Sequence, residues 1–175
     1  MLVVGCVHGD ECAGTAVTAR LVNNALPLAS ELVVVQQLNP DGSARRTRWN
    51  ADGVDLNRNF PFGWSRTARH GRRPFSEPET RVLRRLVRRF RPDVTVWFHQ
   101  PQRLVRAWGK SVATARRYAR ATGLPFRRLR WIGGSAPQWQ NRAFGAVSFV
   151  VELPAGELPP RAADRHARAL LALVR

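Results

Sequence analysis

The chain has 175 residues, of which 44% are hydrophobic, and this is enough for one domain with its own apolar core. It contains no run of about 18 apolar residues and does not open on a basic segment followed by an apolar one, so we expect no membrane span, no export signal and a cytoplasmic protein. The net charge is +17, but every basic residue except Lys110 is an arginine and the arginines are spread along the chain, so we expect no specific nucleic-acid site.

The first half of the chain alternates short apolar runs with a helical pattern. Residues 2–4 predict a strand, residues 13–26 have helical apolar spacing, and residues 32–38 form a β-branched run typical of a second strand. The sequence NPDG at 39–42 predicts a turn. Residues 43–75 are rich in Arg, Asn, Gly and Pro without periodicity, and a loop of that length inside a compact domain is usually functional.

The clearest helix signal begins at Ser76. Ser76 is a preferred N-cap residue, Glu79 three positions later completes a capping box, and Pro78 lies in the first turn. Pro92 ends the pattern. The arginines of this segment predict a solvated face, and the apolar positions expected to be buried are Val82, Leu83, Leu86, Val87 and Phe90.

The second half continues the same alternation. Residues 93–98 predict a strand that runs into His99, and residues 147–153 predict another that contains Glu152. Residues 111–122 and 161–174 predict helices, and residues 131–142 predict a loop rich in Gly, Pro and Trp. Strand–helix alternation of this kind predicts one α/β domain, residues 1–175, in which helices flank a sheet.

Two cysteines, Cys6 and Cys12, are too few for a disulfide framework, so we expect two small buried thiols. Among the histidines, His70 lies in a loop of Arg and Gly, and His166 lies on the last helix among arginines. We expect both of these histidines at the surface.

Polar residues follow several of the predicted strands. His8 and Glu11 follow the first strand, Asn39 the second and His99 the third, while Glu152 lies near the end of the fourth. In open α/β sheets the ligand crevice lies beyond the carboxyl ends of the strands. Two imidazoles and a carboxylate suit a catalytic zinc, which keeps one position open. The H-x-x-E pair alone would suit a polar turn equally well.

Further motifs occur in a fixed order along the chain. NPDG at 39–42 is followed by Arg48, by GVDLNRNFP at 53–61, by SEPET at 76–80, by His99 and by VVELP, which contains Glu152. With H-x-x-E in front, this series resembles the zinc carboxypeptidase family over essentially the whole chain, and most closely its short bacterial members of the murein peptide amidase type. The resemblance implies a mixed, mostly parallel sheet, and it implies that one or two N-terminal edge strands of the family are missing from this chain.

The resemblance also implies a role for each matching residue. His8, Glu11 and His99 would bind one Zn²⁺ per chain, and Asp55 would orient His8. Glu152 would be the general base and acid, and Arg48 would stabilise the oxyanion. Asn57 and Arg58 would hold the free carboxylate of the substrate.

These roles agree with the chemistry of the side chains. A carboxylate beside zinc can accept a proton from water and pass it to the leaving amine, and a guanidinium can hold developing negative charge or a carboxylate. Alternatives remain at single positions. Glu152 alone would also suit a buried ion pair. Asn57, Arg58 and Asn59 would also suit ordering of the long loop, and Arg45 or Arg46 would also suit the oxyanion role.

The sequence therefore predicts a zinc-dependent hydrolase that uses zinc-activated water and a glutamate base to cleave a peptide or amide bond next to a free carboxylate. The expected substrate is a small peptide, with cell-wall peptides as one source. One rival is an amidoacylase of the aspartoacylase or succinylglutamate desuccinylase type, and another is a catalytically silent basic protein that binds anionic polymers. The larger family members carry a tyrosine before the catalytic glutamate, where this chain offers Trp139 and Gln140, and its only tyrosine is Tyr118.

Overall fold

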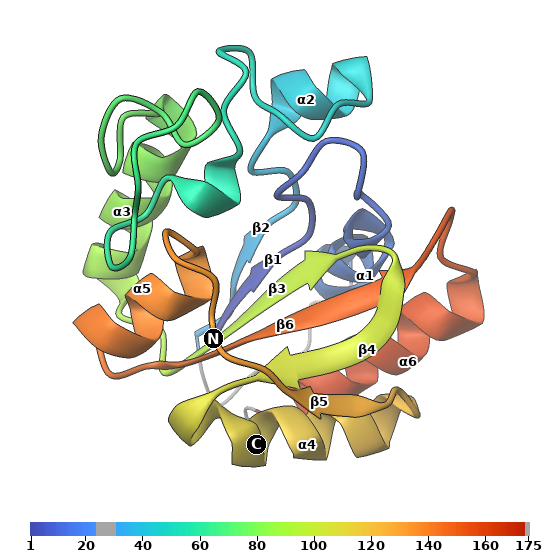
Figure 1. The fold of residues 1–175 in the computed structure, drawn as a ribbon. Helices are drawn as coiled ribbons and strands as arrows, with labels where there is room; N and C mark the ends of the chain where they lie inside the picture. The colour runs from blue at the N-terminus through green and yellow to red at the C-terminus, as the bar shows by residue number, and fades with distance from the viewer. Residues whose placement is uncertain (24–30, 174–175) are drawn as a thin grey trace.

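The computed structural model describes residues 1–23 and 31–173. Within these residues six strands form one mixed sheet in the order β2-β1-β3-β6-β4-β5, and only the β4–β6 pair is antiparallel. Figure 1 shows the sheet running through the centre of the molecule. The expected α/β class with a mostly parallel sheet is confirmed. The strand bounds are β1 Leu2–Val4, β2 Val33–Val35, β3 Val94–His99, β4 Gln102–Ala107, β5 Phe126–Arg128 and β6 Val147–Pro154.

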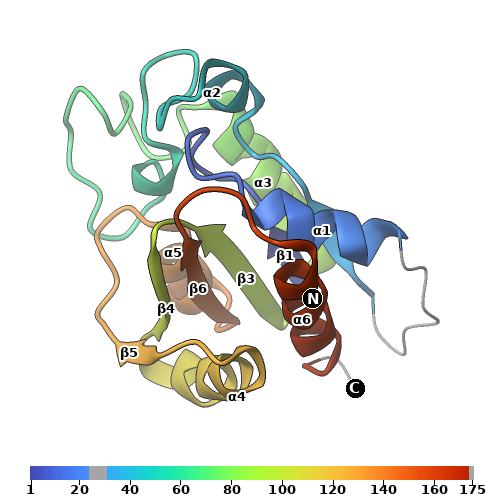
Figure 2. The ribbon, with the colours of Figure 1, turned by 90° about the vertical axis from the view of Figure 1, so that its right-hand side faces the viewer.

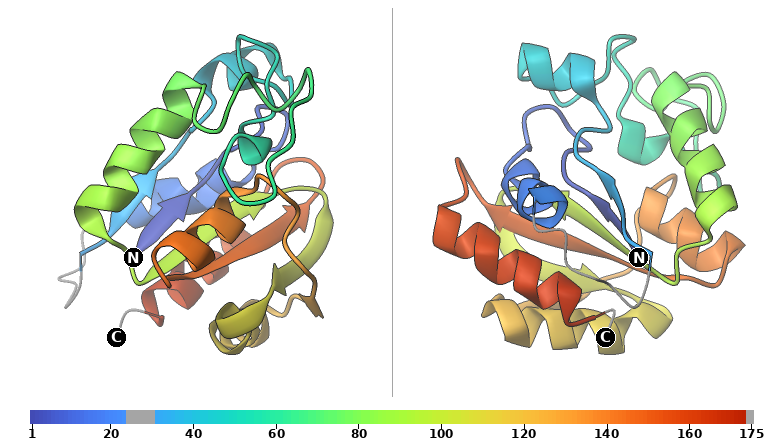
Figure 3. Two further views of the ribbon diagram at one scale, coloured as in Figure 1. Left: turned by 60° about the vertical axis from the view of Figure 1, so that its left-hand side comes forward. Right: turned by 180° about the vertical axis from the view of Figure 1, so that it is seen from behind.

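Helices cover both faces of this sheet (Figure 2). On one face lie α1 (Gly14–Asn23), α4 (Val112–Thr122) and α6 (Pro160–Leu171), which pack in one apolar cluster with Val96 and Phe98 of β3. On the other face α3 (Pro78–Phe90) and α5 (Ala136–Ala143) pack in a second cluster around Trp97 (Figure 3). Alternate residues of β3 therefore point into different cores, as the period of a strand requires.

Two short helical segments follow β2 along the chain, before α3. The NPDG sequence begins α2 (Pro40–Arg45): the Asn39 Oδ1 accepts a hydrogen bond from the Gly42 N–H at 2.9 Å, which caps the helix. The expected turn is therefore the start of a short helix. The long loop that follows is confirmed as mostly irregular, and it contains the 3₁₀ turn η1 (Leu56–Arg58).

The predicted elements differ from the structure mainly at their ends. The strand expected over 32–38 is limited to β2, and the helix expected over 13–26 ends at Asn23 among the described residues. Residues 24–26 of that prediction, and Val174 of the last helix, lie outside the described residues. In α3 the N-cap is Glu77 rather than Ser76, since Pro78 occupies the first helical position, and the Ser76 hydroxyl donates to the Glu77 carboxylate at 2.5 Å.

The buried stripe of α3 is narrower than expected. Leu83 and Val87 are fully buried, whereas Val82 is 50% exposed and Phe90 is 36% exposed. Leu83 and Val87 are four residues apart and therefore lie on one side of the helix, while Val82 is turned about 100° from Leu83. The arginines Arg81, Arg84, Arg85, Arg88 and Arg89 are exposed, as predicted.

Three elements were absent from the sequence prediction. β4 follows Pro101 directly and carries Arg103 and Arg106, so its apolar alternation is confined to Val105 and Ala107. β5 has only three residues, two of them arginines. The expected loop over 131–142 is a loop only to Ser135, because Ser135 and Pro137 begin α5. No helix in the described part of the chain is long and apolar enough to cross a membrane.

Candidate metal centre and active site

The carboxyl end of β1 leads into a tight loop that carries His8 and Glu11. A Cβ atom on Gly9 would lie 1.9 Å from the backbone of Gly42, so this loop packs against α2 only because glycine stands at position 9. His99 is the last residue of β3, the neighbour of β1 in the sheet. The sheet thus brings together three side chains that are up to 91 positions apart in the sequence.

Three donor atoms of these side chains form a small triangle. The His8 Nδ1 and the Glu11 Oε2 are 3.0 Å apart, the His99 Nδ1 and the same oxygen are 3.0 Å apart, and the two Nδ1 atoms are 3.2 Å apart. A tetrahedral zinc with arms of about 2.0–2.1 Å separates its ligand atoms by about 3.3 Å. Two imidazole nitrogens and a carboxylate oxygen are also ligand types that zinc prefers. The residues present therefore fit a zinc ion in both chemistry and spacing.

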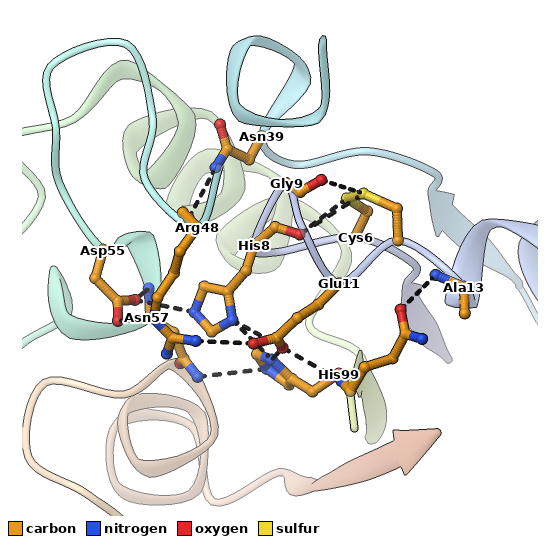
Figure 4. A network of polar contacts seen from close by, with 12 residues as sticks. Cys6, His8, Gly9, Glu11, Ala13, Asn39, Arg48, Asp55, Asn57 and His99 are labelled. Carbon is orange, nitrogen blue, oxygen red and sulfur yellow. Dashed lines mark hydrogen bonds and ion pairs between the residues drawn. A yellow bond between two sulfur atoms is a disulfide. The ribbon is translucent and has the colours of Figure 1, made fainter. Parts of the chain in front are cut away.

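Asp55 contacts the ring nitrogen of His8 that is turned away from Glu11 and His99. The Asp55 Oδ1 lies 3.0 Å from the His8 Nε2, which leaves the Nδ1 of that ring directed at Glu11 and His99 (Figure 4). Asp55 itself is fixed as the N-cap of η1, where it accepts the Asn57 N–H at 2.9 Å. A carboxylate in this position sets the tautomer of a metal-binding histidine.

Arg48 bridges the two carboxylates of the centre. Its Nε donates to the Asp55 Oδ2 at 3.0 Å and its Nη1 donates to the Glu11 Oε1 at 2.8 Å. Arg45 and Arg46 are exposed and do not line the cavity of the centre, so Arg48 is the arginine of this group that reaches it.

The electrostatics of the centre follow from these contacts. Burial raises the pKa of Glu11 and of Asp55, but hydrogen bonds from the histidines and the positive charges nearby outweigh burial and hold both pKa values well below the usual range. Burial lowers the pKa of His8, yet Asp55 and Glu11 together leave it above its ordinary value. For His99 burial dominates, and its pKa falls to about 4. A centre with two ionised carboxylates is suited to a cation.

Glu152 lies beside His99 in the parallel β3–β6 pair. Its side chain is buried, and its Oε2 has no hydrogen-bond partner among the described residues. Burial, followed by the negative charge of Glu11, raises the pKa of Glu152 to about 7, while the charge of Arg106 opposes this shift. A carboxyl group with a pKa near neutrality can both accept and donate a proton.

A cavity of about 120 Å³ joins these groups. The predicted residues His8, Glu11, Arg48, Asn57, Arg58, His99 and Glu152 all line it. The cavity is also lined by residues that the sequence prediction did not assign to the site, namely Gln100, Gln102, Arg106, Ile132 and Val150. Gln102 and Arg106 belong to β4, and Gln100 lies two residues before it, so recognising β4 as a strand would have placed these three near the site.

Asn57 and Arg58 reach the cavity from η1. The Asn57 Oδ1 accepts the Ala136 N–H at 3.0 Å, its Nδ2 lies 3.4 Å from the His99 Nε2, and the Arg58 Nη1 donates to the Asn57 carbonyl at 2.8 Å. Asn59 points elsewhere and orders the loop, because its Nδ2 donates to the carbonyls of His70 and Arg73. The loop-ordering alternative therefore applies to Asn59.

Trp139 and Gln140 do not line the cavity. Both are buried in α5, where Trp139 packs against Phe60 and the Gln140 Nε2 donates to the Thr95 Oγ1 at 2.9 Å. The expectation that they replace a tyrosine of the larger family members is therefore wrong. Tyr118 is buried in the opposite core.

Two further expectations are corrected. Cys6 and Cys12 form a disulfide rather than two thiols, because the loop between them brings their Cα atoms to 4.6 Å, within the range that a disulfide spans. His166 is 4% exposed rather than at the surface. It follows Ala163 by three positions and therefore lies on the face that α6 buries, where its Nδ1 and the Tyr118 hydroxyl form a hydrogen bond of 2.6 Å. His70 lies in the surface loop, away from the cavity.

Known proteins are similar to this chain in both sequence and fold. Over 117 residues the chain is 35% identical to murein peptide amidase A of Escherichia coli strain K12, a match that covers 57% of this chain and 48% of that protein. The chain thus spans about half the length of the curated relatives it matches. The crystal structure of murein-tripeptide amidase MpaA from Escherichia coli O157 has a TM-score of 0.78 and 28% identity, covering 99% of this chain and 80% of that one.

Proteins of lower sequence identity share only the fold with this chain. A succinylglutamate desuccinylase from Silicibacter has a TM-score of 0.72 at 19% identity, over 98% of this chain and 55% of that one. The family model described as zinc carboxypeptidase matches residues 1–140, which include every lining residue named above except Val150 and Glu152. The chain belongs to the zinc carboxypeptidase family.

Proposed function

We propose that this protein is a zinc-dependent hydrolase that cleaves a peptide or amide bond next to a free carboxylate. The observation that carries the proposal is one small cavity that contains the donor triangle of His8, Glu11 and His99, the unpartnered carboxylate of Glu152, and the guanidinium groups of Arg48 and Arg58. A site with a candidate Lewis-acid position, a candidate base and two anion-binding groups matches the requirements of amide hydrolysis.

Zinc bound by His8, Glu11 and His99 would supply a Lewis acid and would lower the pKa of water at its open position. Glu152 is the group that moves protons. Its unpartnered Oε2 accepts a proton from the attacking water, and the resulting carboxylic acid then donates that proton to the leaving nitrogen. Because its pKa is about 7, neither transfer is strongly unfavourable near neutral pH.

The arginines hold the negative charges of the substrate. Arg58, with Asn57 beside it, binds the free carboxylate through the planar fork of its guanidinium, and this contact positions the bond to be cleaved. Arg48 lies next to Glu11 and stabilises negative charge that develops on the carbonyl oxygen in the transition state. In this role Arg48 keeps its hydrogen bond to Asp55 and is thereby fixed before the substrate arrives.

We further propose that the substrate is a small peptide and that cell-wall peptides are its source. The similarity to murein peptide amidase A supports this choice. The amidoacylase alternative shares the fold, as the likeness to a succinylglutamate desuccinylase illustrates, so the identity of the released group must decide between the two. The silent-binder alternative is disfavoured by the complete set of His8, Glu11, His99 and Glu152 in one cavity.

The test is a substrate screen with purified, zinc-loaded protein. We expect one zinc per chain by metal analysis and release of a free C-terminal residue from dipeptides or from γ-linked diaminopimelate peptides. The same samples are assayed for acetate and succinate, and release of either instead of an amino acid would establish the acylase alternative. Absence of zinc above background, or absence of any hydrolysis by the zinc-loaded protein, would refute the proposed function.

A further inference from the structure

β4 brings into the cavity an arginine that has no role in the chemistry above. Arg106 is paired with Val150 of β6, and Leu104 is paired with Glu152, in the antiparallel β4–β6 register. Residues two apart on a strand share a face and lie about 6–7 Å from each other. Arg106 and Val150 therefore lie on the same face as Glu152 but one step further from the carboxyl edge of β6, and all three line the cavity.

Arg106 has no counter-ion in the described part of the chain. No described acidic side chain forms an ion pair with it, and its shielded Nε has no hydrogen-bond partner. Its register neighbour on β5 is Arg127, which has the same charge. A shielded donor without an acceptor is unfavourable, and neighbouring like charges add to that cost. An arginine in such a position is suited to an anion from outside the chain.

The other arginines of the cavity already form hydrogen bonds within the chain. Arg48 is bonded to Glu11 and Asp55, and Arg58 is bonded to the Asn57 carbonyl. A substrate with one free carboxylate needs only one of these three guanidinium groups. A substrate residue with a second carboxylate, in its side chain, would supply a partner for Arg106. Ile132 and Val150 would then contact the methylene groups between the two carboxylates of that substrate residue.

We propose that Arg106 selects substrates in which the released residue carries a carboxylate in its side chain. The cavity of about 120 Å³ is small, which favours short acidic side chains such as that of glutamate. Arg106 is here a specificity-determining residue, since it binds the side chain and takes no part in bond cleavage. The proposal deepens the proposed function and rests on it.

The experiment compares two substrates that differ in one charge. The kcat/KM of the zinc-loaded protein is measured for N-acyl dipeptides ending in glutamate and in glutamine, which have nearly the same shape. A charged hydrogen-bonded pair discriminates by about 10- to 100-fold, so we expect a preference of that size for glutamate. Arg106→Gln should reduce the ratio to about one. Because the charge of Arg106 also acts on the pKa of Glu152, the ratio of the two kcat/KM values is compared rather than the absolute rates.

Two further variants make the comparison specific. Arg106→Lys keeps the charge but loses the planar fork, so it should retain a reduced preference for glutamate. Arg127→Gln removes the same charge from the register neighbour, which is exposed and does not line the cavity, and should leave the ratio as in the wild type. Circular dichroism of each variant tests whether the fold is retained.

The two proposals fail in different ways. Hydrolysis with equal kcat/KM for both peptides, or an unchanged preference in Arg106→Gln, would overturn the role of Arg106 and leave the hydrolase intact. If neither peptide is cleaved, calorimetric binding of the same two peptides decides. Tighter binding of the glutamate peptide that is lost in Arg106→Gln supports the role of Arg106, and equal binding overturns it.

Discussion

Histidines are buried on both faces of the sheet, and the two environments differ in what surrounds the imidazole. At the carboxyl edge, the Nδ1 atoms of His8 and His99 are 3.2 Å apart, and both contact the carboxylate of Glu11. On the opposite face, the His166 Nδ1 shares one hydrogen bond with the Tyr118 hydroxyl, and the ring packs edge-on against Phe98. Burial alone therefore does not distinguish a metal ligand from a core histidine.

The carboxylates make the difference. Two of them, Glu11 and Asp55, contact His8, and its pKa is raised in spite of burial. Glu11 also contacts His99, although burial still lowers the pKa of His99 to about 4. No carboxylate in the described part of the chain forms a hydrogen bond or an ion pair with His166; burial, and then the positive charge of Arg165, lower its pKa to about 4. The first cluster therefore favours a cation, whereas the His166–Tyr118 pair is complete as a neutral pair. The predictions below test this distinction.

The largest expected effect is loss of the metal. In His99→Ala one corner of the donor triangle is missing, so we expect zinc content well below one per chain and hydrolysis at the uncatalysed background. His166→Asn is the matched control, because it removes an equally buried histidine from the other face. It should keep one zinc per chain by metal analysis. If His166→Asn also lost zinc, the distinction between the two clusters would be wrong.

The metal cluster is the part of the site that the sequence reveals most fully. His8, His99 and Glu152 follow or end apolar strands, and parallel strands of one sheet deliver such residues to the same edge. The family resemblance carried by NPDG and NRNFP added Arg48 and Asn57, both of which line the cavity. Their exact partners could not be predicted, because a contact such as that of Arg48 with Glu11 depends on how a 33-residue irregular segment folds back.

Two of the missed features, β4 and the burial of His166, share one physical cause, which is a weak apolar signal. The buried face of α6 is formed largely by alanines such as Ala163 and Ala167, so the stripe that includes His166 does not stand out from the arginines around it. β4 shows only Val105 and Ala107 as apolar positions on one face, since its other face carries Arg106 into a polar cavity. A residue that serves a site breaks the pattern by which its strand would be recognised.

A second prediction separates proton transfer from metal binding. Glu152→Gln removes the titrating carboxylate but keeps the size of the side chain, so kcat/KM should fall by about 10²- to 10⁴-fold. Zinc content should not change, because Glu152 is not part of the donor triangle. Steady-state kinetics and metal analysis on the same preparation test both statements. Retention of full hydrolysis would remove Glu152 from the mechanism.

A third prediction concerns the core histidine. The pKa of His166 is near 6.5 in the unfolded chain and about 4 in the folded protein, so between these values the unfolded chain binds the extra proton. The free energy of unfolding therefore falls as the pH decreases from about 6.5 to about 4. One pKa unit corresponds to about 1.4 kcal/mol, which limits the loss to about 3 kcal/mol.

Urea unfolding across this pH range measures the effect. The difference between the wild type and His166→Asn isolates it, because the other titrating groups are common to both proteins. We expect the variant to lose less stability than the wild type on acidification. Equal pH dependence in the two proteins would show that His166 is not held neutral by its surroundings.

The smallest expected effect tests how firmly the first cluster is oriented. In Asp55→Asn the side chain can still cap η1 through its oxygen, but His8 and Arg48 lose an ionised partner. Loss of such an orienting carboxylate lowers metal affinity by about 10- to 100-fold, which competition with a zinc chelator measures. Asp52→Asn makes the same chemical change at an exposed position of the same loop and should leave the affinity unchanged. Equal zinc affinity in Asp55→Asn and the wild type would reduce Asp55 to a helix cap, and the carboxylates would then not explain why the surroundings of His8 suit a metal ion and those of His166 do not.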